Sequence, residues 1–337
     1  SNTIAFGSTK NINTPGTAIF INCPFPTLDS DAVETKTVII GEGYSSNPYA
    51  AKSIFNISGM SFGAISKPAV LALSNGARIA GCWMNTGEGG ISPYHLEGGA
   101  DLVFQIGTAK YGVRNDDGSL SDEKLANIAT RGQVKMFELK VSQGAKPGKG
   151  GILPGIKVTK QISEIRGIPK GEDSISPNRH VEVSNASELL DMINHVREVT
   201  QKPVGFKTVI GHIRWLEALL EEVNKRGKDS APDFITVDGG DGGTGAAPMA
   251  LMDSVGLPLK EALPLVVDKI MQCGLEDRIK VVASGKMITP SDVAWAICAG
   301  ADFVTSARGF MFAIGCIQSL KCNKNTCPTG ITTHNKR

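Results

Sequence analysis

The sequence is poor in aromatic residues and has neither a long apolar run nor an excess of one charge. Phe, Trp and Tyr make up 6% of the 337 residues, so stacking platforms for nucleic-acid bases are not expected. Lys plus Arg total 35 and Asp plus Glu 33, which argues against a large nucleic-acid footprint, because such a footprint needs clustered basic residues. No apolar run reaches the roughly 18 residues of a membrane helix. The best candidate, residues 303–320, contains Arg308.

No secretory signal pattern opens the chain, and the cysteine usage agrees with that. There are seven cysteines, and an odd number favours a reducing compartment over a disulfide framework, so we expect a cytoplasmic protein. Four of them have apolar neighbours in the sequence and are predicted to be buried small hydrophobic residues: Cys23, Cys82, Cys273 and Cys298. The other three gather near the C-terminus and need a separate explanation.

Glycine, by contrast, is abundant. It accounts for 39 of the 337 residues, well above its usual share of about 7%. Short apolar runs alternate with amphipathic helical patterns, and many of the runs end in glycine-rich turns. Continuous apolar strands between helices are typical of a parallel sheet buried on both faces. Because the glycine motifs follow many strands, they favour a barrel over a doubly wound sheet. We predict an α/β protein, a (β/α)8 TIM barrel over residues 51–337 that follows an irregular N-terminal extension, residues 1–50.

The predicted barrel strands are residues 54–57, 81–84, 134–141, 204–209, 234–237, 279–283 and 303–305. An eighth strand is expected but not placed. The predicted helices are residues 68–79, 186–199, 213–225, 260–273 and 291–299, with Asp253 and Ser291 as N-caps and with Gly274 and Gly300 as C-terminal glycines. In the extension, only residues 18–21 and 37–40 have strand character. The stretch 143–185 lacks periodicity and is predicted to be a functional loop.

Three glycine turns follow predicted strands late in the chain: 239–245 (GGDGGTG), 284–286 (SGK) and 307–309 (ARG). Consecutive late loops form the usual phosphate site of a barrel, since glycine amides and helix N-termini bind phosphate. Lys286 and Arg308 can add charge-assisted hydrogen bonds. The alternative is that these glycines only make tight turns, but three adjacent loops favour phosphate binding.

Two earlier turns, 60–63 (MSFG) and 85–90 (NTGEGG), follow the first two predicted strands and would lie on the same face of the barrel. Polar side chains with glycine at a strand end can meet the edge of a planar ring. The alternative is a pair of ordinary turns with a solvated Glu88.

Charged residues interrupt two of the apolar strands. Glu138 and Lys140 share one strand face because they lie two residues apart, and Lys207 lies inside the next placed strand. A buried charge is costly unless it is paired or meets a ligand. A lysine near the pyrimidine edge of a flavin would stabilise the anionic reduced ring. The alternatives are an internal Lys–Glu pair and strand ends that lie in water.

The remaining cysteines, Cys316, Cys322 and Cys327, are separated by five and four residues, and Pro328 follows. Structural zinc normally takes four ligands, and His334 is the only nearby candidate for the fourth. A cysteine followed by proline is typical of ferredoxin-type iron–sulfur runs. Three thiolates suit a three-iron, four-sulfur cluster with one open corner, and we place zinc second and inert thiols third.

In combination, these motifs resemble the FMN-binding glutamate synthase family, and most closely its stand-alone short form of the large-subunit FMN and iron–sulfur domain. The resemblance covers about residues 57–331. Its pieces occur in this order: ISGMSFGAIS, NTGEGG, ELKVSQGAKPGKGGILPG, GFK, VDGGDGGTGAAP, ASGK and GCIQSLKCNKNTCPTG.

The resemblance implies a barrel that binds FMN and carries a [3Fe-4S] cluster on the C-terminal segment 316–327. It implies that the flavin ring is lined by Met60, Ser61 and Asn85, with Lys207 at its pyrimidine side. It implies that the face of the flavin ring or the phosphate of FMN is contacted by Gly240, Gly242, Gly243, Ser284, Gly285, Lys286, Arg308 and Gly309. It places near the substrate Glu138, Lys140, Gln143 and Lys146. The catalytic residues it implies are Lys207, Glu138, Lys140 and Gln143.

In this family, reduced FMN delivers hydride to 2-iminoglutarate, which forms from 2-oxoglutarate and ammonia, and electrons reach FMN through the cluster. The resemblance therefore implies an oxidoreductase of the CH–NH2 class. The sequence shows no amidotransferase domain and no NADPH-binding half. The implied partners are a 2-oxo acid or amino acid substrate, an electron donor (a ferredoxin or an NAD(P)H-dependent reductase) and, as one option, an amidotransferase subunit.

Three departures from the long enzymes leave the substrate open: Lys149 replaces an acidic residue, Asn323 replaces a histidine, and SGK replaces a DGG phosphate loop. One alternative is a redox relay or sensor subunit that docks on a partner. Another is an FMN barrel oxidoreductase that acts on a different amino or oxo acid. Oxidation of a 2-hydroxy acid would ordinarily use a histidine, and none of the five histidines lies at a convincing end of a predicted strand.

Overall fold

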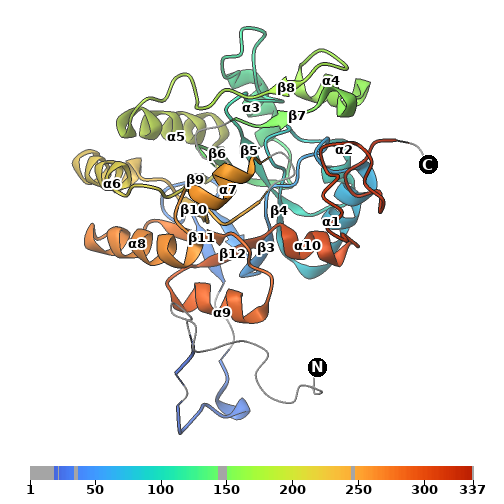
Figure 1. Ribbon diagram of the computed structural model, residues 1–337. Coiled ribbons are helices and arrows are strands. Elements are labelled where there is room, and N and C mark those ends of the chain that lie inside the picture. The colour runs from blue at the N-terminus through green and yellow to red at the C-terminus, as the bar shows by residue number, and fades with distance from the viewer. Residues whose placement is uncertain (1–18, 22, 34–36, 143–149, 244–246, 336–337) are drawn as a thin grey trace, which may run out of the picture. The chain divides into compact units, whose positions relative to one another are not determined.

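The computed structural model describes residues 19–21, 23–33, 37–142, 150–243 and 247–335 (Figure 1). The chain divides into two compact units, residues 1–36 and 37–337. The described residues of the first unit are all exposed, and they contain one short 3-10 helix, η1 (Asp29–Asp31). Residues 19–21 are not in a strand, so that prediction is wrong there, and residue 18 lies outside the described residues.

The second unit contains a closed barrel of eight strands, all parallel to their neighbours, which confirms the predicted (β/α)8 TIM barrel. In order around the barrel, the strands are β3 (Phe55–Ile57), β4 (Trp83–Asn85), β5 (Asp101–Ile106), β6 (Val134–Lys140), β9 (Val204–Val209), β10 (Phe234–Asp238), β11 (Lys280–Ser284) and β12 (Phe303–Ser306). Figure 1 shows the helices arranged around this barrel.

The strand that the sequence left unplaced is β5. Its six residues, DLVFQI, contain Asp101 and Gln105, which break the apolar run. In the barrel, Gln105 is buried because it hydrogen-bonds to a neighbouring strand. Glu138 and Lys140 therefore lie on the fourth barrel strand and Lys207 on the fifth.

The five predicted helices are confirmed with small shifts at their ends. The helices in the described residues are α1 (Lys67–Ala80), α2 (Pro93–Glu97), α3 (Asp122–Ala129), α4 (Lys160–Arg166), α5 (Ala186–Thr200), α6 (Arg214–Arg226), α7 (Met249–Ser254), α8 (Leu259–Gln272), α9 (Pro290–Cys298) and α10 (Arg308–Ala313), with 3-10 turns η2 (Gly155–Lys157) and η3 (Lys228–Ser230).

The predicted N-caps are wrong, while the C-terminal glycines are confirmed. Asp253 lies inside α7, and Pro258 precedes α8. The cap of α9 is Thr289, whose hydroxyl accepts a hydrogen bond from the Asp292 amide while the Asp292 carboxylate accepts from the Thr289 amide. This reciprocal pair places the N-cap two residues before Ser291, and the helix starts at Pro290. Gly274 and Gly300 have φ of +66° and +100°, which a side chain would strain.

One end of the barrel is closed. The antiparallel strands β1 (Val38–Ile40) and β2 (Tyr49–Ala51) bury Ile40 and Tyr49 against Trp83 and Phe303, which begin β4 and β12. The Trp83 and Phe303 rings pack edge to face with centroids 4.9 Å apart. Because these aromatic residues begin their strands, the closed end is the N-terminal end of the barrel, and ligands must approach from the other end.

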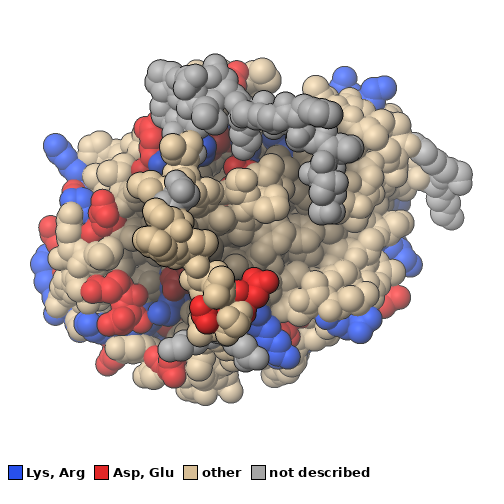
Figure 2. All heavy atoms as spheres, turned by 90° about the horizontal axis from the view of Figure 1, so that it is seen from below, with Lys and Arg blue, Asp and Glu red and all other residues tan. Residues whose placement is uncertain are grey.

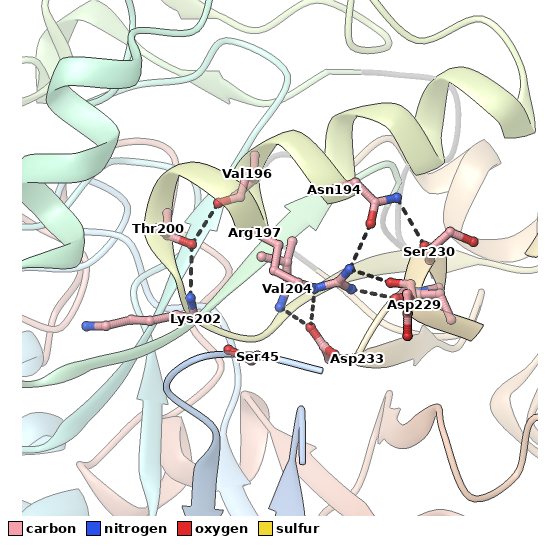
Figure 3. Close-up of polar contacts among 12 residues, drawn as sticks. Ser45, Asn194, Val196, Arg197, Thr200, Lys202, Val204, Asp229, Ser230 and Asp233 are labelled. Atoms are coloured by element: carbon pink, nitrogen blue, oxygen red, sulfur yellow. Dashed lines mark hydrogen bonds and ion pairs between the residues drawn. The ribbon is translucent and has the colours of Figure 1, made fainter. Parts of the chain in front are cut away.

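A buried charge network stabilises the same closed end (Figure 3). The Asp233 carboxylate accepts from Arg197 Nε at 3.0 Å and from the Val204 amide at 2.7 Å, and Arg278 Nη1 lies 2.8 Å from its second oxygen. Figure 3 shows Arg197 reaching from α5 toward Asp233, with Asn194 bonded to the same guanidinium. A carboxylate between two guanidinium groups at this end is a feature of stability rather than of catalysis.

The stretch 143–185, which we predicted to be a loop, contains elements of its own in its described part. Strands β7 (Ile152–Leu153) and β8 (Ser174–Ile175) pair antiparallel, and η2 and α4 lie between them. We call residues 150–185 the insertion. Short elements of two to seven residues have too little periodicity to be recognised from sequence.

The prediction for the four scattered cysteines is wrong for three of them. Cys82 is buried, but Cys23 and Cys298 are exposed and Cys273 is half-buried. Apolar neighbours in the sequence do not decide which face of a helix a residue occupies, and Cys298 ends α9 on an exposed position.

Among the described residues, no helix is both long and apolar enough to cross a bilayer. The apolar stretch 303–320 instead divides into β12 and α10. The face in Figure 2 carries acidic and basic side chains interspersed, without a field of one sign.

Candidate functional site

The open, C-terminal end of the barrel brings together most of the residues that the sequence singled out. Asn85 ends β4, Lys140 ends β6 and Ser284 ends β11, while Lys207 lies two residues before the end of β9. Met60 and Ser61 follow β3, and the glycine turns follow β10, β11 and β12. We call this set of strand ends and turns the rim. Gln143 and Lys146 lie outside the described residues.

Glu138 is the centre of a hydrogen-bond network inside the barrel. Its Oε1 accepts from Asn85 Nδ2 at 2.8 Å and from Gln105 Nε2 at 2.6 Å, and its Oε2 accepts from Thr236 Oγ1 at 2.7 Å. The side chain is buried, with 3% exposure. Donors from three other strands therefore hold a carboxylate just below the rim.

The two lysines of the rim pair with carboxylates other than Glu138. Lys207 Nζ lies 3.5 Å from Asp238 Oδ2, and Lys140 Nζ lies 3.2 Å from Glu88 Oε2. Asp238 also accepts a hydrogen bond from Ser284 Oγ at 2.9 Å. The alternative of an internal Lys–Glu pair is therefore realised by Lys140 and Glu88, so Glu88 is paired and mostly buried rather than solvated. Among the described residues, Glu138 forms no ion pair with a lysine. Two cations with matched carboxylates lie on neighbouring strands.

Sequence reasoning missed three members of this site: Gln105, Thr236 and Asp238. Gln105 was missed together with β5. Thr236 and Asp238 alternate along β10 on the same side as Lys207 of the paired strand, since Thr236 is in register with Lys207. The period-two pattern of polar residues in an otherwise apolar strand was the signal that could have identified them.

The barrel interior below the rim is filled. A cavity of about 10 Å³ remains among Asn85, Glu138, Lys207 and Thr236, which is about enough for one water molecule. A planar ring therefore cannot enter the barrel and would have to lie over the rim, against Met60, Ser61 and the ends of the strands.

The predicted phosphate loops contain two kinds of glycine. The amides of Gly240, Gly242 and Gly309 already donate, to Leu257 O, Gly239 O and Ser306 Oγ. A Cβ at Gly240 would lie 2.5 Å from Gly256 O, so packing of the chain on itself requires that glycine. For these residues the tight-turn interpretation accounts for the sequence, and a role in binding stays a prediction.

The other part of the loops is open to a ligand. Within the described residues, the amides of Gly285 and Lys286 donate to no acceptor, and Lys286 has a positive φ of 48°. A Cβ at Gly243 would lie 2.7 Å from Arg308 Nη2, so the turns after β10 and β12 meet. Two amides, two cations and a close backbone approach are a donor set suited to a phosphate.

His95 holds the turn after β3 in place through a hydrogen bond to its backbone. This histidine of α2 is completely buried, and its Nε2 lies 2.9 Å from Met60 O. Burial lowers the pKa of His95 to about 4, so the ring is neutral and Nε2 can donate to the carbonyl. A neutral imidazole thus holds the backbone of a residue predicted to line the flavin.

The insertion covers one side of the rim and brings His180 to the end of β6. His180 Nε2 lies 3.1 Å from Lys140 O, and its Nδ1 is buried without a hydrogen-bond partner among the described residues. Burial, together with nearby Lys110, lowers the pKa of His180 to about 4. A histidine therefore does lie at a strand end, although the sequence alone gave no sign of it, because it comes from a distant segment.

The three C-terminal cysteines lie in the segment that follows α10. Cys327 is buried and Cys316 and Cys322 are half-buried. Burial raises the pKa of the Cys327 thiol, but hydrogen bonds from Thr329 and Thr332 outweigh it and bring the pKa down to about 6. The described residues contain no group of three His, Cys, Asp or Glu side chains close enough to hold a metal ion, so the cluster stays a prediction.

The fold and the rim define a class, the parallel α/β barrels with a polar open end. A solved structure with this fold, a flavocytochrome b2 variant with benzoylformate, matches with a TM-score of 0.54 and 17% identity, over 92% of this chain and 72% of that one. At this identity the likeness concerns the fold alone.

The family follows from the sequence comparison. The family described as the conserved region in glutamate synthase matches residues 17–337, and the chain belongs to it. The glutamate synthase large subunit-like protein YerD of Bacillus subtilis is 48% identical over 88% of this chain and 56% of its own length. The archaeal glutamate synthase [NADPH] of Methanocaldococcus jannaschii is 36% identical over 82% of this chain and 51% of its own length. The chain thus spans about half the length of the curated relatives it matches.

Proposed function

We propose that this chain is an FMN-dependent oxidoreductase of the glutamate synthase type, which aminates 2-oxoglutarate reductively through 2-iminoglutarate to L-glutamate. The observation that carries the proposal is the rim of a filled barrel, with cations and open amides at one side and paired lysines at the other. Membership of the glutamate synthase family supports the reaction type. FMN, when bound, supplies hydride transfer.

The residues of this chain would hold FMN by its two ends. The phosphate would be bound by Lys286, Arg308 and the amides of Gly285 and Lys286, which donate to no described acceptor. The ring would lie over Met60, Ser61 and Asn85. Lys207, held by Asp238 at 3.5 Å, would place a fixed positive charge at the pyrimidine side.

Lys140 and Glu88 would bind the oxo acid. Their ion pair of 3.2 Å lies at the end of β6, beneath the insertion. An anionic carboxylate of the substrate would be attracted by the Lys140 ammonium, and Glu88 would keep that ammonium in place. Glu138 would keep Asn85 and Gln105 oriented below the ring, since both amide side chains donate to it.

Electrons would reach FMN from a separate donor protein through an iron–sulfur centre at Cys316, Cys322 and Cys327. The depressed pKa of Cys327 favours the thiolate that such a centre requires. Because the sulfurs are not grouped in the described residues, we derive no electron-transfer step. Ammonia would come from solution or from an amidotransferase subunit, in a cytoplasmic setting.

The test is the reoxidation of flavin in chemically reduced, anaerobic protein. We expect 2-oxoglutarate with ammonium to reoxidise the flavin and to yield L-glutamate in equal amount. Lys140→Met should slow the reoxidation at least tenfold, since the variant lacks the ammonium that would attract the carboxylate of the substrate. The matched control is Lys135→Met, which lies on the same strand and pairs with Asp101 at 3.6 Å, near the closed end. Flavin that reoxidises with an artificial acceptor but not with any oxo acid and ammonium would indicate a redox relay instead.

A further inference from the structure

The turn between β3 and α1 has three consecutive backbone carbonyls that are each bound by a side chain from a distant part of the chain. The bonds join Phe62 O to Arg166 Nη2 at 3.4 Å, Gly63 O to His334 Nε2 at 2.9 Å, and Ala64 O to Lys157 Nζ at 2.7 Å. Two of the three side chains come from the insertion, and the third comes from segment 331–335. Both segments therefore meet on the turn that carries Met60 and Ser61.

The two side chains from the insertion are buried cations that bind carbonyls. Lys157 is 2% exposed and Arg166 is 4% exposed. Among the described residues, the Lys157 ammonium donates to the carbonyls of Ala64 and Cys322 and forms no ion pair. Burial of a charge without a counter-ion costs free energy, whereas water could bind the same carbonyls. The cost indicates that the conformation of this turn matters beyond its connection of β3 to α1.

The conformation of the turn is also fixed by its packing. Gly63 has a φ of +109°, which a side chain would strain. A Cβ there would lie 3.1 Å from both Arg166 Nη2 and Leu153 Cδ2, so residues of the insertion press directly on the backbone. The Phe62 ring packs edge to face on the His334 ring, with centroids 5.6 Å apart. The side chains that bind the carbonyls therefore also limit the space of the turn.

The insertion and segment 331–335 are joined to each other as well as to the turn. Asn325 connects the two, because its Nδ2 donates to Ile156 O at 3.3 Å and its Oδ1 accepts from the His334 amide at 2.8 Å. The Ser66 amide, at the end of the turn, donates to Ile331 O at 2.8 Å. The two segments thus form one support for the turn.

The start of the turn is left available to a ligand. Within the described residues, the Ser61 amide donates to no acceptor, and Ser61 is only half-buried. The Met60 amide donates to Asn85 O at 3.0 Å, which ties this part of the turn to the end of β4. The residues that we expect to line the flavin therefore directly precede the carbonyls that are held.

We propose that Lys157 and His334 are positioning residues, which hold the turn 61–64 in the conformation that meets the flavin ring, so that the insertion and segment 331–335 complete the flavin site. The inference rests on the proposed function. Neither side chain would touch FMN, since both act through the backbone of the turn. The apparent affinity for a ligand falls with the fraction of molecules whose site has the binding conformation. A loosened turn would therefore weaken FMN binding without the loss of a contact to FMN.

The experiment is an equilibrium titration of the flavin-free full chain with FMN, together with visible circular dichroism of the bound flavin. Lys157→Met and His334→Leu should each weaken the affinity at least tenfold, which corresponds to a binding-competent turn in no more than about a tenth of the molecules. Both should also alter the dichroism of the flavin, because the surroundings of the ring change.

Conservative variants and a matched control distinguish the hydrogen bonds from general packing. Lys157→Arg and His334→Gln keep a donor for the carbonyl and should restore most of the affinity. The control is Lys160→Met, which makes the same chemical change three residues further along the insertion, where the lysine side chain is 83% exposed. It should bind FMN as the wild type does.

The outcomes separate the inference from the proposed function. Unchanged affinity and dichroism in folded Lys157→Met and His334→Leu overturn the inference alone, and so does a loss that Lys157→Arg and His334→Gln do not relieve. Wild-type protein that binds no FMN overturns the proposed function and the inference with it. Far-ultraviolet circular dichroism checks folding, and if one variant does not fold, the other decides. If neither folds, the two residues serve the barrel rather than the flavin site, and the inference is wrong.

Discussion

At the residue scale, Glu138 shows how a polar group can be part of a barrel core. A carboxylate has no donors, so it can only be buried where donors surround it. Asn85, Gln105 and Thr236 supply them from β4, β5 and β10. The network ties four strands together directly beneath the rim, and it fixes the amide of Asn85 that we expect to meet a ligand.

We predict that Glu138→Leu lowers the free energy of unfolding by roughly 3 kcal/mol or more, because three buried donors lose their acceptor. Glu138→Gln should cost less, since its carbonyl can still accept from both amides. Urea unfolding measures both values. Glu198→Gln, at an exposed position of α5, is the control. A Glu138→Leu variant as stable as the wild type would show that the network contributes nothing.

The sequence predicted the charged rim residues but not their partners. Glu138, Lys140 and Lys207 stand out because charge inside an apolar strand is rare. Their partners do not stand out, because Asp238 and Glu88 end strands or begin turns, where polar residues are common. Pairing across strands depends on register, and register is a property of the closed barrel rather than of any one segment.

At the element scale, the glycine turn after β10 is packed on the segment before α8. Gly240 N donates to Leu257 O at 2.7 Å, and its Cα faces the backbone of Gly256. Glycine is needed there because of the protein's own backbone, whereas in the turn after β11 the amides of Gly285 and Lys286 donate to no acceptor among the described residues. A motif written as a run of glycines thus combines packing and binding positions, which the sequence alone cannot separate.

We predict that Gly240→Ala destabilises the fold by about 1–3 kcal/mol, because its Cβ would lie 2.5 Å from Gly256 O and overpacking costs this much. The matched control is Gly211→Ala, where a Cβ would meet nothing within 4 Å. Thermal and urea unfolding compare the two variants. If the two variants were equally stable, the close approach of residue 240 to the backbone of Gly256 would not require a glycine, and the prediction would be wrong.

Whether a helix or strand could be predicted from the sequence depended on its length. Long amphipathic helices such as α5 and α8 were predicted within a few residues, because their periodicity is strong. Strand β5 and the short elements of the insertion were missed, because a polar residue or a length of two residues removes the pattern. His180 lies at the end of β6 but was missed because it comes from a distant segment of the chain.

At the scale of the whole molecule, the two ends of the barrel differ in the residues that they contain. The N-terminal end is closed by aromatic packing and by the Arg197–Asp233–Arg278 network, and the C-terminal end carries the rim. Charge of both signs is distributed over the surface seen in Figure 2. The packing that closes the barrel and the residues that we expect to bind a ligand therefore lie at opposite ends of the barrel axis.

The buried histidines make the stability of the whole unit depend on pH. Burial lowers the pKa of His95, and burial with Lys110 lowers that of His180, each to about 4, from about 6.5 in the unfolded chain. Below pH 6.5 the unfolded state binds protons that the native state does not, so stability falls as the pH drops toward 4. Above pH 6.5 these groups contribute no pH dependence.

We expect each buried histidine to account for about 2 kcal/mol of lost stability between pH 7 and pH 5. His180→Gln should remove one such contribution, so that its unfolding free energy changes less between the two pH values than that of the wild type. Urea unfolding at both pH values gives the difference. His212→Gln, at an exposed position, should leave the wild-type dependence unchanged. An identical dependence in His180→Gln would contradict this account.

The central claim is that the rim of the barrel binds FMN, and equilibrium titration of the flavin-free protein with FMN tests it most directly. We predict saturable binding of one FMN per chain, accompanied by quenching of flavin fluorescence. We also predict that Arg308→Met weakens the affinity at least tenfold, whereas Arg131→Met, an exposed residue of the turn before β6, leaves it unchanged. Binding that does not saturate, or that is indifferent to Arg308, would contradict the assignment of the site.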